Sequence, residues 1–78
     1  MDRKELEAQI IEMVSTSYDK DVEDLALDTV FAELGGSSVQ MVGLVSEIEN
    51  ELDVMIQLAD AATCTTIGDL VDKVEEEM

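Results

Sequence analysis

The chain has 78 residues, 46% of them apolar, and twenty acidic against four basic side chains give it a formal net charge of −16. A chain of this length holds one small domain with a single core, and its apolar content is too high for a disordered acidic segment. The shortage of Lys and Arg excludes nucleic acid as a partner, because binding to phosphates requires them. Basic protein surfaces are attracted instead.

The composition also excludes several kinds of site. Histidine is absent and Cys64 is the only cysteine, so the chain offers no intramolecular disulfide and no base beside a nucleophile. Acidic residues from Asp19 onward alternate like the start of a calcium loop, but Asp24 and Val30 stand where that loop requires Gly and Glu. No membrane span or signal peptide is visible. We therefore expect a cytoplasmic monomer that is not an enzyme and binds no metal.

The first predicted helix covers about residues 3–17. Asp2, with Glu5 three residues later, gives a capping signal at its start. Apolar residues then recur at helical spacing, at Leu6, Ile10, Met13 and Val14. The following segment, 18–36, has no sustained periodicity, and we expect a long loop wrapped on the core. Its expected anchors are apolar: Val22, Leu25, Leu27, Val30, Phe31 and Leu34.

The second predicted helix covers about residues 37–52 and follows a doublet of glycines, Gly35 and Gly36, which suits a turn. Ser37 is placed to cap this helix, with Gln40 returning a bond to the cap. Ser38 then falls in the first turn, near the positive end of the helix dipole, where an attached phosphate is favoured. One apolar stripe is assigned to the core: Met41, Leu44, Val45, Ile48 and Leu52.

The last third of the chain predicts a connector and two further helical pieces. Val54, Ile56 and Leu58 are expected to form a buried connector, and residues 60–64 a short helical turn. Thr66 with Asp69 repeats the capping pattern at the start of a helix over about 66–75. Its apolar face comprises Ile67, Leu70, Val71 and Val74. The prediction is an all-α, small four-helix bundle, three main helices and a short one, with a long first loop, in a single domain over 1–78.

A family resemblance rests on segment 34–39, which reads Leu-Gly-Gly-Ser-Ser-Val. It resembles the Leu-Gly-Gly-(Asp or His)-Ser-(Leu or Ile) motif of acyl and peptidyl carrier proteins, and by that match Ser38 carries 4′-phosphopantetheine. Ser37 departs from the family pattern, which has Asp or His there. The resemblance covers nearly the whole chain, from the amphipathic first helix to the final helix opened by Thr-Thr-Ile at 65–67.

The resemblance implies a carrier of acyl or aminoacyl groups in fatty-acid, polyketide or nonribosomal peptide biosynthesis. A phosphopantetheinyl transferase would attach the arm from coenzyme A to Ser38 through a phosphodiester, and the arm's thiol would hold the cargo as a thioester. Loading and biosynthetic enzymes with basic docking surfaces would be the other partners. The alternative is an unmodified acidic helical interaction module, because Gly-Gly-Ser-Ser is also an ordinary loop and helix cap.

Four residues of the second helix are expected to dock these partners: Val39, Val42, Glu47 and Glu51. The two valines lie off the core stripe, so they either pack beneath the long loop or form an exposed apolar strip beside Ser38, which we favour. Glu47 and Glu51 are four residues apart and share a face of the helix. Glu49 lies well round the helix from both, and we expect it to matter less.

Overall fold

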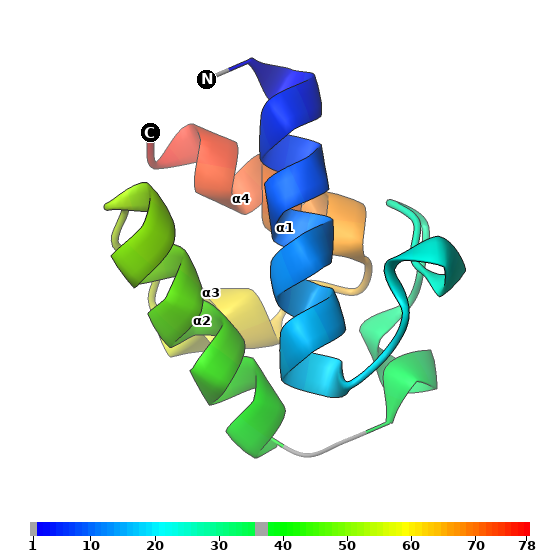
Figure 1. Ribbon diagram of the computed structural model, residues 1–78. Helices are drawn as coiled ribbons and strands as arrows, with labels where there is room; N and C mark the ends of the chain where they lie inside the picture. Colours follow the sequence, from blue (N-terminus) through cyan, green and yellow to red (C-terminus); the bar gives the residue numbers. More distant parts are fainter. Residues whose placement is uncertain (1, 36–37) are drawn as a thin grey trace.

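The computed structural model describes residues 2–35 and 38–78, and over these residues the protein is a bundle of four α-helices (Figure 1). The helices are α1 (Arg3–Tyr18), α2 (Ser38–Leu52), α3 (Leu58–Ala62) and α4 (Ile67–Glu76). The first loop contains two short 3₁₀ turns, η1 (Val22–Asp24) and η2 (Phe31–Leu34). The predicted all-α bundle with a long first loop is therefore confirmed.

Helix α1 begins and ends where local chemistry requires. The Asp2 side chain accepts a hydrogen bond from the Glu5 backbone N–H at 2.9 Å, which confirms the predicted cap. The helix ends after Tyr18 because Asp19 adopts the left-handed conformation, with φ of 55°. Helix α2 runs back beside α1 in the opposite direction (Figure 1). Leu52, which the sequence also assigned to the core, is only half-buried against it. The rest of the two facing stripes is buried as predicted: Leu6, Ile10, Met13, Val14, Met41, Leu44, Val45 and Ile48.

The short third helix lies earlier than residues 60–64, where the sequence predicted it. The carbonyl of Gln57 accepts hydrogen bonds from the backbone N–H groups of Asp60 and Ala61, at 3.0 and 3.1 Å. These bonds start the helix at Leu58, and residues 63 and 64 form the turn that follows it.

Two predicted apolar anchors are exposed in the structure. Val22 is 48% exposed because η1 carries acidic, solvated neighbours and turns at the surface, so that this part of the loop reaches the core only at Leu25. Leu58 is 43% exposed because it is the first residue of α3, whereas Ile56 in the same connector is buried. The expectations of burial for Val22 and Leu58 were therefore wrong.

The first loop is fastened to the start of α4 by backbone hydrogen bonds, which we call the loop seam. The bonds run from the N–H of Phe31 to the carbonyl of Thr65 (2.9 Å), from Ile67 to Thr29 (3.1 Å) and from Gly68 to Leu27 (2.7 Å). A Cβ added at Gly68 would lie 3.0 Å from the Leu27 carbonyl oxygen. Glycine at 68 therefore allows the close approach of the two backbones.

A capping box completes the start of α4. The Thr66 hydroxyl accepts a hydrogen bond from the Asp69 backbone N–H at 3.1 Å, and the Asp69 carboxylate accepts one from the Thr66 backbone N–H at 3.1 Å. The predicted pairing of Thr66 and Asp69 is confirmed. Inside the bundle, α4 buries the face that the sequence assigned to it: Ile67, Leu70, Val71 and Val74.

The first and last helices are also joined by one arginine. The Arg3 guanidinium contacts the carboxylates of Glu7 at 2.8 Å, Asp72 at 2.8 Å and Glu75 at 3.1 Å. These hydrogen-bonded carboxylates, Glu7 first and then Asp72, raise the pKa of Arg3 above its ordinary value. The two ends of the described chain thus lie close together, as Figure 1 shows.

Candidate functional site

Ser38 is the first residue of α2, and its side chain is exposed. The preceding loop reaches it through Gly35, whose φ of 72° lies in the left-handed region that favours glycine. Gly36 and Ser37 lie outside the described residues, and so does the predicted cap by Ser37. A hydroxyl at this position is accessible to another protein and lies in the first turn of a 15-residue helix, where the dipole favours negative charge.

A hollow of about 350 Å³ opens beside Ser38. It is lined mainly by apolar side chains from four elements and the first loop: Tyr18, Phe31, Ala32, Gly35, Ser38, Met41, Leu58 and Ala62. Tyr18 and Phe31 contact each other, with ring centroids 5.9 Å apart. Partial burial raises the pKa of the Tyr18 hydroxyl above its ordinary value. An apolar chain attached near Ser38 would therefore find an apolar hollow next to it.

Most of this hollow was not predicted from the sequence. Its walls come from segments far apart in the chain, and no periodic pattern links Ala32 or Ala62 to Ser38. The two aromatic residues of the chain, Tyr18 and Phe31, were the only available signal, because aromatic side chains in so aliphatic a sequence suggest a special environment.

Val39 and Val42 are exposed, at 72% and 46%. They are not packed beneath the first loop, which was the alternative left open by the sequence. Around the α2 axis, successive residues turn by about 100°, so Ser38 lies between Met41, which lines the hollow, and Val42. Ser38 is thus bordered by apolar side chains on both sides.

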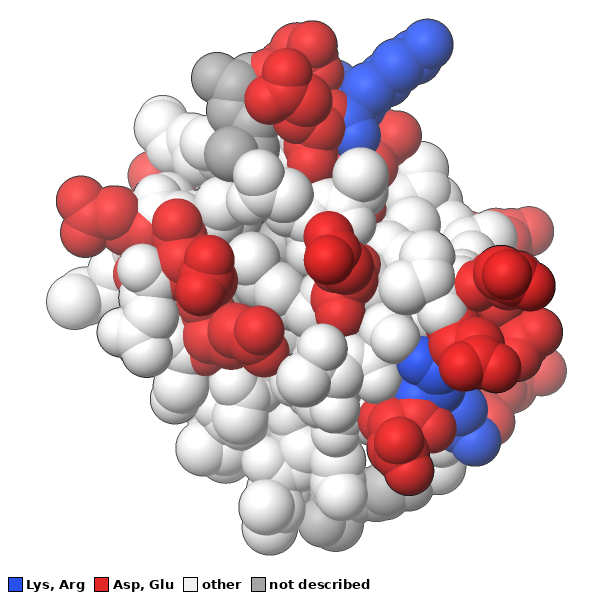
Figure 2. All heavy atoms as spheres, viewed as in Figure 1, with Lys and Arg blue, Asp and Glu red and all other residues white. Residues whose placement is uncertain are grey.

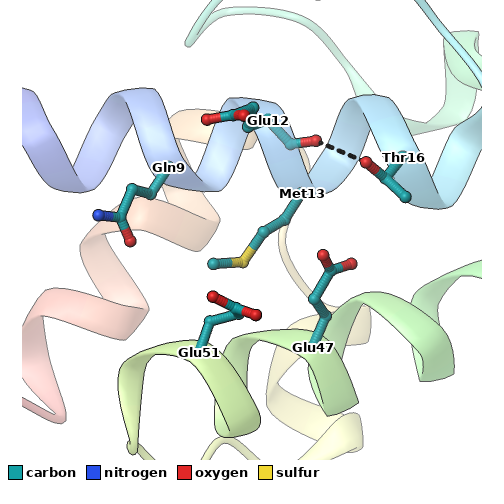
Figure 3. Close-up of a pocket in the computed structure, with 6 residues that line it drawn as sticks. All are labelled: Gln9, Glu12, Met13, Thr16, Glu47 and Glu51. Atoms are coloured by element: carbon teal, nitrogen blue, oxygen red, sulfur yellow. Dashed lines mark hydrogen bonds between the residues drawn. The ribbon is translucent and has the colours of Figure 1, made fainter.

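Glu47 and Glu51 point in another direction, toward α1. With Gln9, Glu12, Met13 and Thr16 they line a groove of about 300 Å³ between α1 and α2. Figure 3 shows both carboxylates directed from α2 toward α1, with the Met13 thioether between the helices. The structure therefore brings Glu47 and Glu51 together, but it does not place them beside Val39 and Val42.

Glu49 is the acidic residue on the same side of α2 as Val42. The two are seven positions apart, and seven steps of about 100° bring a helix to within about 20° of its starting direction. Glu49 is half-buried, and the groove lined by Glu47 and Glu51 does not include it. The expectation that Glu49 lies well round the helix from Glu47 and Glu51 agrees with this arrangement.

The described residues offer little other chemistry. Among residues 2–35 and 38–78, no group of three His, Cys, Asp or Glu side chains is arranged to hold a metal ion. Cys64 is half-buried, and burial, followed by the charge of Asp69, raises the pKa of its thiol. A thiol with a raised pKa is a poor nucleophile at neutral pH. The site presents the Ser38 hydroxyl at the surface.

Comparison with known proteins shows the family to which the chain belongs. The phosphopantetheine attachment site family matches residues 8–74. The chain belongs to this family of carrier proteins. Its relatives include proteins named acyl carrier protein, from Streptococcus thermophilus (35% identical; 88% of this chain and 90% of the relative) and Streptococcus pyogenes (32% identical over the same shares). Another, from Exiguobacterium, is 27% identical over the full length of both chains.

Family membership settles the class of molecule. This carrier protein is not a catalyst, and its cofactor is 4′-phosphopantetheine. The residues around Ser38 fit such a group, because the hydroxyl is exposed at a helix start and has an apolar hollow beside it. In the described part of the carrier protein, no helix has both the length and the apolar character that crossing a bilayer requires.

Proposed function

We propose that the protein carries acyl groups as thioesters on a 4′-phosphopantetheine arm attached to Ser38. The observation that carries this proposal is the position of Ser38: it is exposed, it begins α2, and it occupies the place of the modified serine in the motif at 34–39. A phosphopantetheinyl transferase would form the bond between the Ser38 oxygen and the arm's phosphorus, with the nucleotide half of coenzyme A leaving. The serine proton would pass to a base of the transferase.

The chain's own residues would position and shelter what the arm holds. The arm supplies a terminal thiol for the thioester. The phosphodiester charge at Ser38 would be favoured by the α2 dipole, a contribution of about 0.3–1 kcal/mol at an exposed helix end. The hollow bordered by Tyr18, Phe31 and Leu58 would receive an apolar cargo. Removing apolar surface from water favours such binding.

We also propose Val39, Val42, Glu47 and Glu51 as docking residues, in two separate sectors of α2. The valines adjoin Ser38, whereas the two glutamates lie in the groove facing α1. A partner with Lys or Arg would be attracted to the glutamate sector. The names of the relatives favour acyl over aminoacyl cargo. Our proposal places this cargo in fatty-acid or polyketide biosynthesis, in the cytoplasm.

The attachment is tested by intact-mass measurement after incubation with coenzyme A and a broad-specificity phosphopantetheinyl transferase. The wild-type chain and Ser37→Ala should each gain one arm, and Ser38→Ala should gain none while keeping its circular dichroism spectrum. An arm on folded Ser38→Ala would refute the assignment. Absence of an arm from the wild-type chain would favour the unmodified interaction module. Co-expression with candidate loading enzymes, read by the same measurement, would identify the cargo.

A further inference from the structure

The stretch of chain around Ser38 carries no charged side chain, although the chain as a whole is highly acidic. No ionisable side chain occurs between residues 35 and 46, which include the first two turns of α2. In Figure 2 the lowest part of the molecule, where α2 begins in Figure 1, shows neither acidic nor basic side chains, while red patches cover other parts of this view. We call this uncharged end, with Val39, Val42, Leu58 and Ala62 around Ser38, the Ser38 pole.

Helix α3 contributes to the Ser38 pole with one face only. Leu58 and Ala62, four residues apart, border the same hollow as Ser38. The one acidic residue of α3, Asp60, lines a different cavity together with Lys73 and Glu77 near the end of α4. The face of α3 turned toward Ser38 is therefore apolar, and its charge is directed away.

The charged side chains of the segments next to the Ser38 pole do not line the hollow. In the first loop, Glu33 of η2 is exposed but does not line the hollow that Ala32 and Gly35 border. At the end of α1, Asp19, Lys20 and Asp21 follow Tyr18 and together carry one negative charge, but none of the three lines the hollow. Among the described residues, the hollow beside Ser38 thus has no charged side chain in its lining.

Distance weakens the influence of the other acids on α2. Glu47 is nine residues beyond Ser38, which corresponds to about 13 Å along the helix axis. The Debye length at physiological ionic strength is about 8 Å. A cation of a partner held against Ser38 would therefore be largely screened from Glu47, and still more from Glu49 and Glu51. Before the partner covers this surface, these carboxylates therefore contribute little to a charge contact next to the serine.

We infer that the transferase that modifies Ser38 covers the Ser38 pole with apolar side chains, and that basic side chains of the enzyme do not contact this pole. This inference rests on the proposed attachment at Ser38. An enzyme that forms a bond to the Ser38 oxygen must cover the surface around it, and that surface offers two exposed valines and an apolar hollow. Lys or Arg placed there would lose hydration without gaining a partner. The acidic surfaces elsewhere would serve long-range attraction.

The sign of a charge effect tests the inference. Glu is introduced at the pole in Val39→Glu and Val42→Glu, and kcat/KM for arm transfer is measured with a transferase that modifies the wild-type chain. We expect each variant to lower kcat/KM about fivefold or more, because a carboxylate would be buried against apolar side chains. Val39→Glu should stay folded, since an acid in the first turn of a helix is favoured.

Two matched variants separate charge from other causes. Val22→Glu adds the same charge at an exposed valine of η1, 48% exposed against 46% for Val42, and should change kcat/KM by less than about twofold. Val42→Gln removes the same apolar contact without adding charge, and should fall between wild type and Val42→Glu.

The outcomes distinguish this inference from the proposed function. A wild-type chain without an arm, or with an arm elsewhere than Ser38, overturns the proposed function and this inference with it. If Ser38 is modified but Val39→Glu or Val42→Glu reacts as fast as wild type, faster, or no slower than Val22→Glu, the apolar contact alone is refuted. Circular dichroism melts of each variant show that the rates refer to folded protein.

Discussion

Helices α2 and α4 begin in contrasting ways. The start of α4 is held by the loop seam and by the capping box of Thr66 and Asp69, so its backbone groups are bonded to the protein itself. The start of α2 presents an exposed serine and Val39, which is 72% exposed. Both are helix N-termini with the same dipole. The start of α4 is therefore a joint of the fold, whereas the start of α2 presents Ser38 at the surface, where we propose that a partner enzyme attaches the arm.

The largest difference in stability between the two helices is expected from Gly→Ala substitutions at the glycine inside each of them. A Cβ at Gly43 in α2 would meet nothing within 4 Å, whereas one at Gly68 in α4 would lie 3.0 Å from the Leu27 carbonyl oxygen. Gly43→Ala should raise the free energy of unfolding by up to about 1 kcal/mol. Gly68→Ala should lower it by up to about 2 kcal/mol, because overpacking the loop seam costs about 1–3 kcal/mol and the helix propensity of alanine returns at most about 1 kcal/mol.

Urea unfolding of both variants measures this difference directly. The two substitutions are chemically identical, so the sign of the change isolates the effect of the seam. Equal stabilisation by both would show that the seam adjusts freely and that the start of α4 is not a rigid joint.

A smaller effect is expected at the cap of α4. Thr66→Ala removes the hydroxyl that accepts the Asp69 N–H bond and should cost about 1 kcal/mol of stability. It should leave arm transfer to Ser38 unchanged, since Thr66 does not line the hollow beside Ser38. Thr16→Ala, at an exposed threonine within α1, is the control and should not lower stability. A loss of transfer rate in folded Thr66→Ala would show that the two helix starts are coupled.

The smallest expected effect is a change of stability with pH that comes from Tyr18, which lines the hollow beside Ser38. Burial favours its neutral form and raises its pKa in the folded protein, while the unfolded chain titrates at about 10. The folded state therefore retains a proton that the unfolded state loses, and stability should decline as pH rises through and beyond the unfolded pKa. Tyr18 is the only tyrosine, so phenolate absorbance reports its pKa directly.

The same titration, carried out on loaded and unloaded protein, tests whether cargo enters the hollow. A loaded acyl chain lying beside Tyr18 should bury the ring further and raise the pKa again, whereas Tyr18→Phe should show no phenolate absorbance at all. An unchanged titration midpoint in loaded protein would place the cargo elsewhere. A midpoint at or below the ordinary value in the unloaded protein would contradict the burial of Tyr18.

Periodicity predicted the parts of this fold that depend on one helix at a time. The buried stripes of α1, α2 and α4 and the Thr66–Asp69 cap follow from local spacing, and so does the place of Ser38 at a helix start. The loop seam and the hollow could not be predicted, because their partners lie far apart in the sequence. Spacing also showed that Glu47 and Glu51 share a face, but only the packing of α2 revealed that this face meets α1.

The Arg3 contacts with Glu7, Asp72 and Glu75 hold the beginning and end of the described chain together at one side of the bundle. In Figure 1 both termini lie at the top of the view, and α2 begins at the bottom. A tether attached at either terminus, whether a purification tag, a solid support or a neighbouring domain, would pull from the side opposite Ser38. The serine would remain accessible, and the molecule could rotate about its anchor to meet several enzymes in succession.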